Sequence, residues 1–254
     1  QMSQEEGIHF LLHRTHLLRS HEALKTASQR NYRMASQIAH ALDGLPLALD
    51  QAGAYIHESG CNLTDFLHLF QTSPGRLLDA REENAHHPLS VTKTFTMIYE
   101  ELEHKNPMSI ELLVLCSFLA PDVIPERLFT ESASLLGSAI QAFVSDPWLW
   151  NASLKDLLRY SLIMCNPETK TFTMHRLVQT VIRDRISEQD QREYISRLVT
   201  ALTQIFPRES LKMEHWSWCE QLVPHIIKVV STHEQITDPI AASSLLYQTA
   251  TYLC

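Results

Sequence analysis

ALDGLPLALDQAGAYI, residues 41–56, is the stretch of sequence that decides the fold. One apolar helical pattern ends at Asp43-Gly44, and another begins at once on Pro46. Glycine tolerates the left-handed backbone that ends many helices, and proline suits a first helical turn, where its missing N–H group needs no partner. Gly53 is small enough to admit a neighbouring backbone. The stretch therefore predicts a tight corner between two packed helices, the second with an apolar face formed by Leu45, Leu49, Ala52 and Ile56.

The rest of the chain is also predicted to be mainly helical, because it has only six glycines and few clusters of β-branched residues. Four helices, at 4–18, 31–42, 46–59 and 62–70, form a first bundle, in which Asn62 caps the fourth helix. Further helices are expected at 91–104, 107–119, around 128–129, and at 134–144, 148–160, 175–186, 190–206, 216–230 with an interruption at Pro224, and 239–252.

A pair of strands provides the clear β signal of the sequence. Residues 162–165 and 171–174 flank the polar segment 166–170, whose residues favour a turn, so the pair predicts a β-hairpin. Residues 122–125 are expected to turn the chain into a short helix. Several helices, a hairpin and then another helix is the order of elements in a winged-helix module. We therefore expect three parts: a helical domain at 1–85, a winged-helix domain at 86–187, and a helical connector at 188–254.

Composition narrows the function further. The 254-residue chain carries a formal net charge of −8, which opposes binding to a phosphate backbone. The five cysteines are odd in number and scattered, which favours reduced thiols in the cytoplasm. No apolar run reaches the roughly 18 residues that span a bilayer, so no membrane association is expected. The adjacent pair His86-His87 lies in a polar segment and is interpreted as two solvated side chains, not as a metal site.

Two short motifs carry a resemblance to a known family. Residues 44–49, GLPLAL, resemble the motif of that name in NB-ARC (STAND) signalling ATPases, and residues 174–179, MHRLVQ, resemble the MHD-type motif that closes their winged-helix domain. Residues 112–129, between the two motifs, are similar to the opening of that domain. The form of the second motif, and the similarity of residues 215–226 and 241–253 to a connector and a first TPR helix, indicate the NB-ARC–TPR type found in bacteria. The resemblance covers about residues 1–187, the ARC1 and winged-helix parts, and then the start of a TPR region.

The resemblance implies roles for individual residues. In the family the proline of GLPLAL lines the adenine pocket, which implies that Pro46, with Gly44 and Leu45 beside it, contacts the nucleotide. The histidine of the second motif contacts the β-phosphate of ADP and holds the inactive state, which implies this role for His175. The alternative is that His175 only caps a buried turn. Arg176 stands where the family usually has aspartate, and it is expected to pair within its helix or with a preceding domain.

The sequence lacks the chemistry of ATP hydrolysis. It contains no G-x-x-x-x-G-K-[ST] loop to cradle phosphates, no acidic strand end for magnesium, and no G-x-S-x-G or H-E-x-x-H motif. The chain is therefore expected to be a non-enzymatic regulatory segment that works with an upstream nucleotide-binding domain and downstream TPR repeats. It would couple ADP/ATP state to sensing of a ligand or protein, with oligomerisation possible on activation and no nucleotide held tightly by the segment alone. Two alternatives stay open: a winged-helix DNA-binding regulator, and a helical adaptor that needs no nucleotide.

Overall fold

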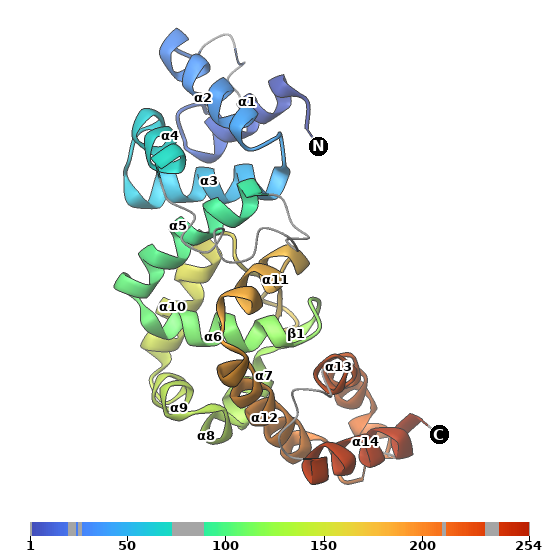
Figure 1. The fold of residues 1–254 in the computed structure, drawn as a ribbon. Helices are drawn as coiled ribbons and strands as arrows, with labels where there is room; N and C mark the ends of the chain where they lie inside the picture. Colours follow the sequence, from blue (N-terminus) through green and yellow to red (C-terminus); the bar gives the residue numbers. More distant parts are fainter. Residues whose placement is uncertain are drawn as a thin grey trace. The chain divides into compact units, whose positions relative to one another are not determined.

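The computed structural model describes residues 2–19, 24, 27–72, 89–209, 212–231 and 239–253. Within these residues the protein is mainly helical, with fourteen helices and one small sheet of three short strands (Figure 1). The predicted fold class, helices with a small β-hairpin, is confirmed. The chain forms two compact units, unit 1 at 1–105 with 159–162, and unit 2 at 106–158 with 163–254. The predicted boundary at 85–86 and the pair His86-His87 lie outside the described residues, so the domain division stays a prediction.

Unit 1 is a helical bundle in which the helix after the GLPLAL corner is central. That helix, α3, packs against α1 and α5, while α2 packs against α1 and α4. Ser3 caps the first helix reciprocally, because its hydroxyl accepts the Glu6 N–H group and the Glu6 carboxylate accepts the Ser3 N–H group at 2.8 Å. Asn62 caps the fourth helix as predicted, by accepting two backbone N–H groups. The helices are α1 (Gln4–Arg14), α2 (Gln29–Ala41), α3 (Pro46–Ser59), α4 (Leu63–Thr72) and α5 (Leu89–Lys105).

The first helix ends at Arg14, four residues before its predicted end. The Thr15 hydroxyl donates to the carbonyls of Leu11 and Leu12, and His16 takes a left-handed backbone conformation with φ of 57°. The chain then turns back, so that Leu18 is buried although it lies beyond the helix. The apolar pattern continued past the helix end because the residues after the turn still contribute to the core.

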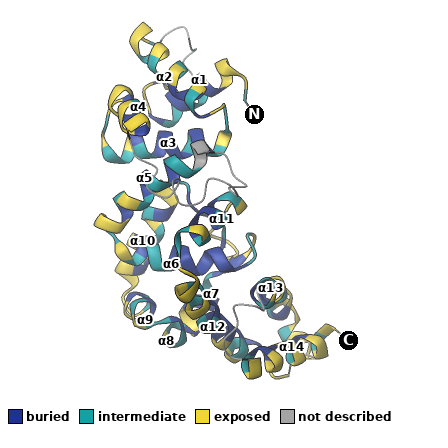
Figure 2. Cartoon of the chain, in the orientation of Figure 1, coloured by how far each residue is buried: buried dark blue, intermediate teal, exposed yellow. Residues whose placement is uncertain are grey.

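Unit 2 is built around helix α6, most of whose residues are buried (Figure 2). Helices α9, α11 and α12 contact α6, and α12 in turn contacts α7, α8, α13 and α14. The elements are α6 (Pro107–Phe118), β1 (Ile124–Pro125), α7 (Glu126–Glu131), α8 (Ala133–Leu136), α9 (Ser138–Val144), α10 (Pro147–Arg159), β2 (Met164–Asn166), β3 (Thr171–Thr173), α11 (Arg176–Arg185), α12 (Glu188–Ile205), α13 (Met213–Val230) and α14 (Pro239–Leu253).

The predicted hairpin is confirmed, but the sheet has a third strand that the sequence did not reveal. Strands β2 and β3 pair antiparallel, with Cys165 opposite Phe172. Ile124 and Pro125 form β1 on the other edge of β3, in the order β1-β3-β2. A proline tolerates an edge strand because it lacks only an N–H group that a central strand would need. A two-residue strand is too short to produce a periodic signal, which explains why 122–125 was predicted as a turn alone.

Two other helix predictions need correction. The segment predicted as one helix at 134–144 is split between α8 and α9 by Gly137, whose φ of 122° is not helical. Helix α13 continues through Pro224 instead of being interrupted there. Proline removes only its own N–H group from the helical ladder, and Pro224 is exposed, so its ring does not displace core side chains.

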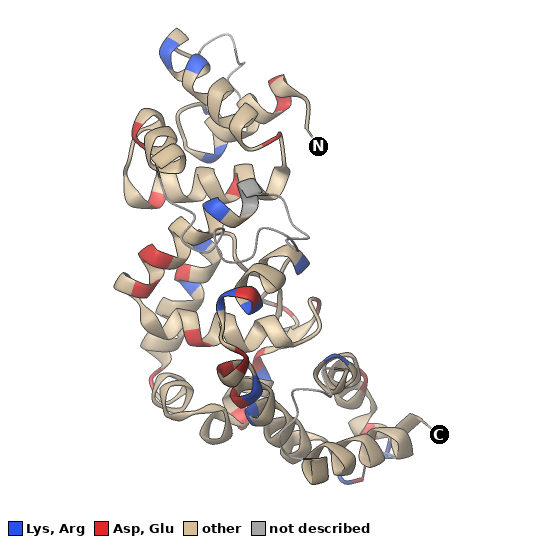
Figure 3. Cartoon of the chain, viewed as in Figure 1, with Lys and Arg blue, Asp and Glu red and all other residues tan. Residues whose placement is uncertain are grey.

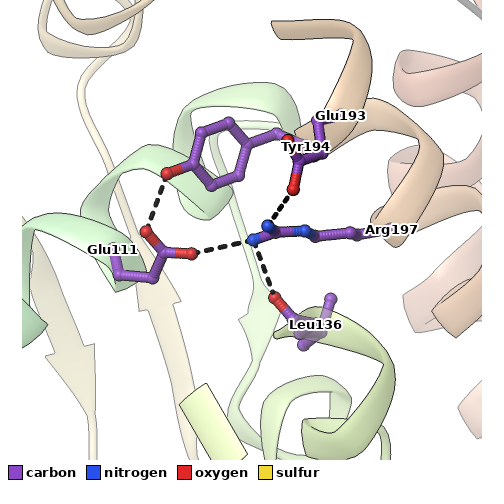
Figure 4. Close-up of polar contacts among 5 residues, drawn as sticks. All are labelled: Glu111, Leu136, Glu193, Tyr194 and Arg197. Atoms are coloured by element: carbon purple, nitrogen blue, oxygen red, sulfur yellow. Dashed lines mark hydrogen bonds and ion pairs between the residues drawn. The ribbon is translucent and has the colours of Figure 1, made fainter. Parts of the chain in front are cut away.

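A polar cluster fastens α12 to the surrounding helices (Figure 4). Glu111 of α6 accepts from the Tyr194 hydroxyl at 2.7 Å and pairs with the Arg197 guanidinium at 3.0 Å. Arg197 also contacts Glu193 and donates to the Leu136 carbonyl at the end of α8. The cluster is half-buried, so its charges are only partly screened by water, and it fixes how α6, α8 and α12 meet.

Candidate functional site

The predicted GLPLAL corner has the geometry that the sequence indicates. Asp43 and Gly44 both have left-handed backbone, with φ of 55° and 60°, and α3 begins at Pro46 in its first turn. The Gly44 carbonyl accepts the Met2 N–H group at 2.9 Å. A Cβ atom at Gly44 would lie 2.8 Å from the Met2 carbonyl oxygen, so the position admits only glycine without rearrangement. Leu45 is the N-cap residue, and the Pro46 ring is exposed.

Gly53 of α3 admits a side chain instead of the expected backbone. A Cβ atom at Gly53 would lie 2.5 Å from Cγ of Arg14, so the arginine stem crosses α3 at that glycine. The Arg14 guanidinium pairs with Asp50 at 2.8 Å and donates to the Arg159 carbonyl and the Ser161 hydroxyl. Gly53 therefore makes room for the ion pair that ties α1 to α3 and to residues 159–161 of the same unit.

A shallow hollow lies beside the corner. Its volume is about 240 Å³, and it is lined by Met2, Gln4, Ala39, His40, Asp43 and Gly44. Pro46 does not line this hollow. The amide group of Gln51, further along α3, is fully buried and has no hydrogen-bond partner among the described residues.

The second predicted site residue, His175, lies at the N-terminus of α11. It directly follows β3 and Met174, and its Nδ1 atom accepts the N–H group of Leu177 at 3.1 Å. His175 is therefore a helix cap, but it is exposed and does not cap a buried turn. Because Nδ1 accepts, the proton of the neutral ring sits on Nε2, for which the described residues provide no acceptor. Arg176 is also exposed and has no ion-pair partner among the described residues, so the expected pairing within the helix is absent.

Helix α11 is attached to the end of α6 by two of its polar side chains. Gln179 is 3% exposed, and its amide nitrogen donates to the carbonyls of Cys116 and Leu119, both at 3.0 Å. Arg183 donates to the Ser117 carbonyl, and burial lowers the pKa of its guanidinium. The last carbonyls of a helix have no partner within the helix. Side chains of α11 therefore supply partners that α6 itself cannot provide.

The residues between α6 and β1 are also held from two sides. The Met174 N–H group donates to the Pro121 carbonyl at 2.8 Å. Two residues on, the Val123 carbonyl lies 3.0 Å from Nε2 of His225, a fully buried residue of α13. Burial lowers the pKa of His225, because a charged imidazole loses hydration there. The neutral ring therefore donates from Nε2 to Val123.

The structure describes the predicted site residues in two separate groups. Gly44, Leu45 and Pro46 belong to unit 1, and His175 belongs to unit 2. The buried polar residues Gln51, Gln179 and His225 were not among the predicted site residues. Each lies on a helix face whose neighbours are apolar, and a polar residue at such a position was the available signal.

A larger hollow of about 550 Å³ lies in unit 2 between α7, the hairpin turn and α13. Arg127 stacks on the Trp218 ring at 4.5 Å and pairs with Glu131 at 2.6 Å. The hollow is lined by residues of both charges, Glu126 and Glu214 as well as Arg127 and Lys170. This balance selects no single class of ligand.

Metal and thiol chemistry find no support within the described residues. No group of three or more His, Cys, Asp or Glu side chains there is placed to hold a metal ion. Cys61, Cys116, Cys165 and Cys219 are free, and burial raises the pKa of each thiol, which disfavours the reactive thiolate. No helix in the described part of the chain is both long and apolar enough to cross a membrane.

Comparison with known proteins finds two similarities. Residues 100–191, from the end of α5 to the start of α12, match a family described as a domain of unknown function (DUF7779). A protein of Hyaloscypha variabilis described as a nucleotide-binding leucine-rich repeat (NLR)-like protein is 24% identical over 212 residues, 78% of this chain. The chain spans about one fifth (20%) of the length of that relative.

Proposed function

We propose that this chain is the regulatory segment of a nucleotide-operated signalling switch of the NB-ARC type, in which ADP or ATP state is coupled to sensing by TPR-like repeats. The observation that carries the proposal is the exposed His175 at the start of α11, with one ring nitrogen fixed by the helix and the other left for a ligand. The similarity to an NLR-like protein supports the same class of function.

His175 has the chemistry to read a phosphate. Nδ1 is held by the Leu177 N–H group, which fixes the ring plane and leaves Nε2–H as a donor. The N-terminus of a ten-residue helix adds favourable partial positive charge, and Arg176 adds a full one. The β-phosphate of ADP is the ligand proposed here, and the usual aspartate of the family motif is not needed for these contacts.

Pro46 has the chemistry to receive a base. Its ring is exposed at the first turn of α3, on a corner that Gly44 and the Met2 backbone hold rigid. A flat apolar ring surface suits packing against adenine. Gly44 and Leu45 then act by shaping the corner, since Gly44 is engaged with Met2 and Leu45 is the N-cap residue of α3.

The proposed mechanism is a population shift. ADP contacts made by His175 and Pro46 would favour a closed state, and ATP together with engagement of the sensor would favour an open one. The P-loop and the magnesium ligands would come from a preceding nucleotide-binding domain, so this segment itself catalyses nothing. Oligomerisation of the open form is part of the same proposal.

The experiment measures ADP release from a longer protein that contains this chain. His175→Ala removes both the cap and the phosphate contact, whereas His175→Asn keeps a cap acceptor and removes the imidazole. Loss of a hydrogen bond to a charged group predicts that both variants release ADP about tenfold faster or more. His104→Ala, an exposed histidine at the end of α5, is the matched control. Parental release from His175→Asn would show that His175 is only a helix cap.

The DNA-binding alternative has less support than the switch. A winged-helix DNA reader would use a helix next to the hairpin, α10 or α11. Helix α10 exposes Trp148, Leu149 and Leu158, and on α11 the Arg183 side chain is turned onto α6. Acidic and basic residues are interspersed along the described helices of unit 2 (Figure 3). A gel shift at low and moderate salt tests this, because binding through phosphates would weaken steeply with salt.

A nucleotide-independent adaptor is the second candidate, and the exposed apolar side chains of α13 and α14 favour it. Trp216, in the proposed connector, is 45% exposed. Ile240 and Tyr247, in the helix proposed to begin the TPR repeats, are 83% and 75% exposed. Aromatic side chains such as those of Trp216 and Tyr247 are enriched at protein interfaces. Partner binding by the 254-residue chain that is unaffected by ADP or ATP in the longer protein would favour this candidate over the switch.

A further inference from the structure

The segment 121–123, which we call the α6–β1 loop, joins two parts of unit 2 that are distant in sequence. On one side, the Pro121 carbonyl accepts the N–H group of Met174, the residue directly before His175. On the other side, the Val123 carbonyl accepts from Nε2 of His225 in α13. The two carbonyls are two residues apart, so a shift at one of them is passed to the other through a single short piece of backbone.

Val123 makes this loop strained. Its φ of 55° lies in the left-handed region, which a β-branched residue seldom adopts, and its side chain is 49% exposed, so core packing does not impose the conformation. The residue persists there because neighbouring contacts hold it. The hydrogen bond from His225 is the contact that reaches the carbonyl of the strained residue itself.

His225 is suited to hold the loop. It is fully buried on α13, its Nε2 donates to Val123, and its Nδ1 has no partner among the described residues. The Val123 carbonyl therefore provides the hydrogen bond that offsets burial of the imidazole. If the loop moves away from α13, the buried Nε2–H group of His225 and the strained backbone at Val123 lose their hydrogen bond at the same time. The loop is therefore expected to occupy distinct positions and not to deform gradually.

We propose that the α6–β1 loop couples the N-terminus of α11 to α13, with His225 as the positioning residue that holds the loop in its strained conformation. A displacement of Met174 and His175 moves Pro121 and changes the backbone conformation at Val123. This change alters the hydrogen bond between the Val123 carbonyl and His225, which holds α13 against the loop. The functional meaning of this coupling rests on the proposed role of His175 in reading nucleotide. The coupling itself is a property of unit 2 and does not require that role.

The first experiment measures amide hydrogen exchange in the 254-residue chain. His225→Leu removes the donor, whereas His225→Gln keeps an N–H donor at a similar distance from the backbone. We expect exchange of the Met174 amide to be about tenfold faster in His225→Leu and close to parental in His225→Gln. The Trp150 amide, bonded to Asp146 in α10, is the reference within the same unit. Unchanged exchange at Met174, or equal acceleration at Met174 and Trp150, would overturn the coupling.

The second experiment measures ADP release from the longer protein. His225→Leu is expected to change the ADP release rate about fivefold, and His225→Gln is expected to restore most of the parental rate. Parental release from His225→Leu, in a protein that binds ADP, would overturn the functional coupling and leave the proposed function standing. A longer protein that binds no ADP would refute the proposed function, and the exchange experiment would then decide the coupling by itself.

Discussion

Gln179 gives the sharpest test of how α11 is held, because both of its hydrogen bonds go to the end of α6. Gln179→Met keeps the size and shape of the side chain and removes the donor. The Cys116 carbonyl retains the Leu119 N–H group at 3.3 Å, but the Leu119 carbonyl loses Gln179, and the surroundings are buried. The Leu119 carbonyl, buried and left without a partner, costs about 1–3 kcal/mol, and loss of the hydrogen bond to the Cys116 carbonyl, which keeps another partner, costs about 1 kcal/mol. We therefore expect unfolding of unit 2 to become easier by about 2–4 kcal/mol.

The assay is urea unfolding followed by tryptophan fluorescence. All four tryptophans of the chain, at 148, 150, 216 and 218, lie in unit 2, so the signal reports that unit alone. Gln191→Met is the matched control, because Gln191 also donates to two carbonyls near a helix end, those of Arg183 and Ile186, but is half-buried. Water can replace part of its role, so its loss should cost no more than about 1 kcal/mol. Equal effects of the two substitutions would refute the reasoning.

Gln179→Glu adds a test by pH. The carboxyl group would face two carbonyl oxygens in a buried site, which favours its neutral, hydrogen-bond-donating form. Its pKa in the folded state would therefore lie above the value of about 4.3 in the unfolded chain. The folded state then binds more protons between these two pKa values, so stability falls as the pH rises through that interval and is constant above it. Stability of this variant that rises over the same interval would contradict the predicted environment.

Three further predictions concern other positions. Gly44→Ala should destabilise unit 1 by about 2–3 kcal/mol, because the left-handed backbone is strained and the added Cβ atom clashes with Met2. Gly60→Ala, with a similar φ but open space around it, should cost about 1 kcal/mol. Hydrogen exchange of unit 1 amides measures both changes in stability. Gln51→Met should leave unit 1 as stable or up to about 1 kcal/mol more stable by the same measurement, because the buried amide it replaces has no partner among the described residues. The lowered pKa of His225 means that its contribution to the stability of unit 2 is complete above about pH 6.5. This contribution is lost as the pH falls through the pKa of the folded state. Urea titrations at pH 7.5 and 5.5 should show this pH dependence in the parent and not in His225→Gln.

The sequence predicted the parts of the fold that depend on local chemistry. The corner at Asp43-Gly44, the start of α3 at Pro46 and the cap at Asn62 follow from backbone preferences of single residues, and the structure has each of them. Strand β1 could not be predicted in this way, because two residues become a strand only by pairing with β3, almost fifty positions later. The exposure of His175 has the same origin, since its surroundings depend on contacts that local patterns do not specify.

Gln51 and Gln179 show why the partners of buried polar side chains near the candidate site are harder to predict from sequence than the helices that carry them. Both are buried glutamines on apolar helix faces, so sequence patterns treat them alike. Gln179 satisfies carbonyls of α6, about sixty residues earlier in the chain, and so fixes the angular position of α11. An apolar stripe alone would tolerate small rotations of that helix, whereas a donor bonded to two carbonyls at 3.0 Å does not. Because His175 lies one turn before Gln179 on the same helix, the bond that orients the helix also determines where the exposed imidazole stands.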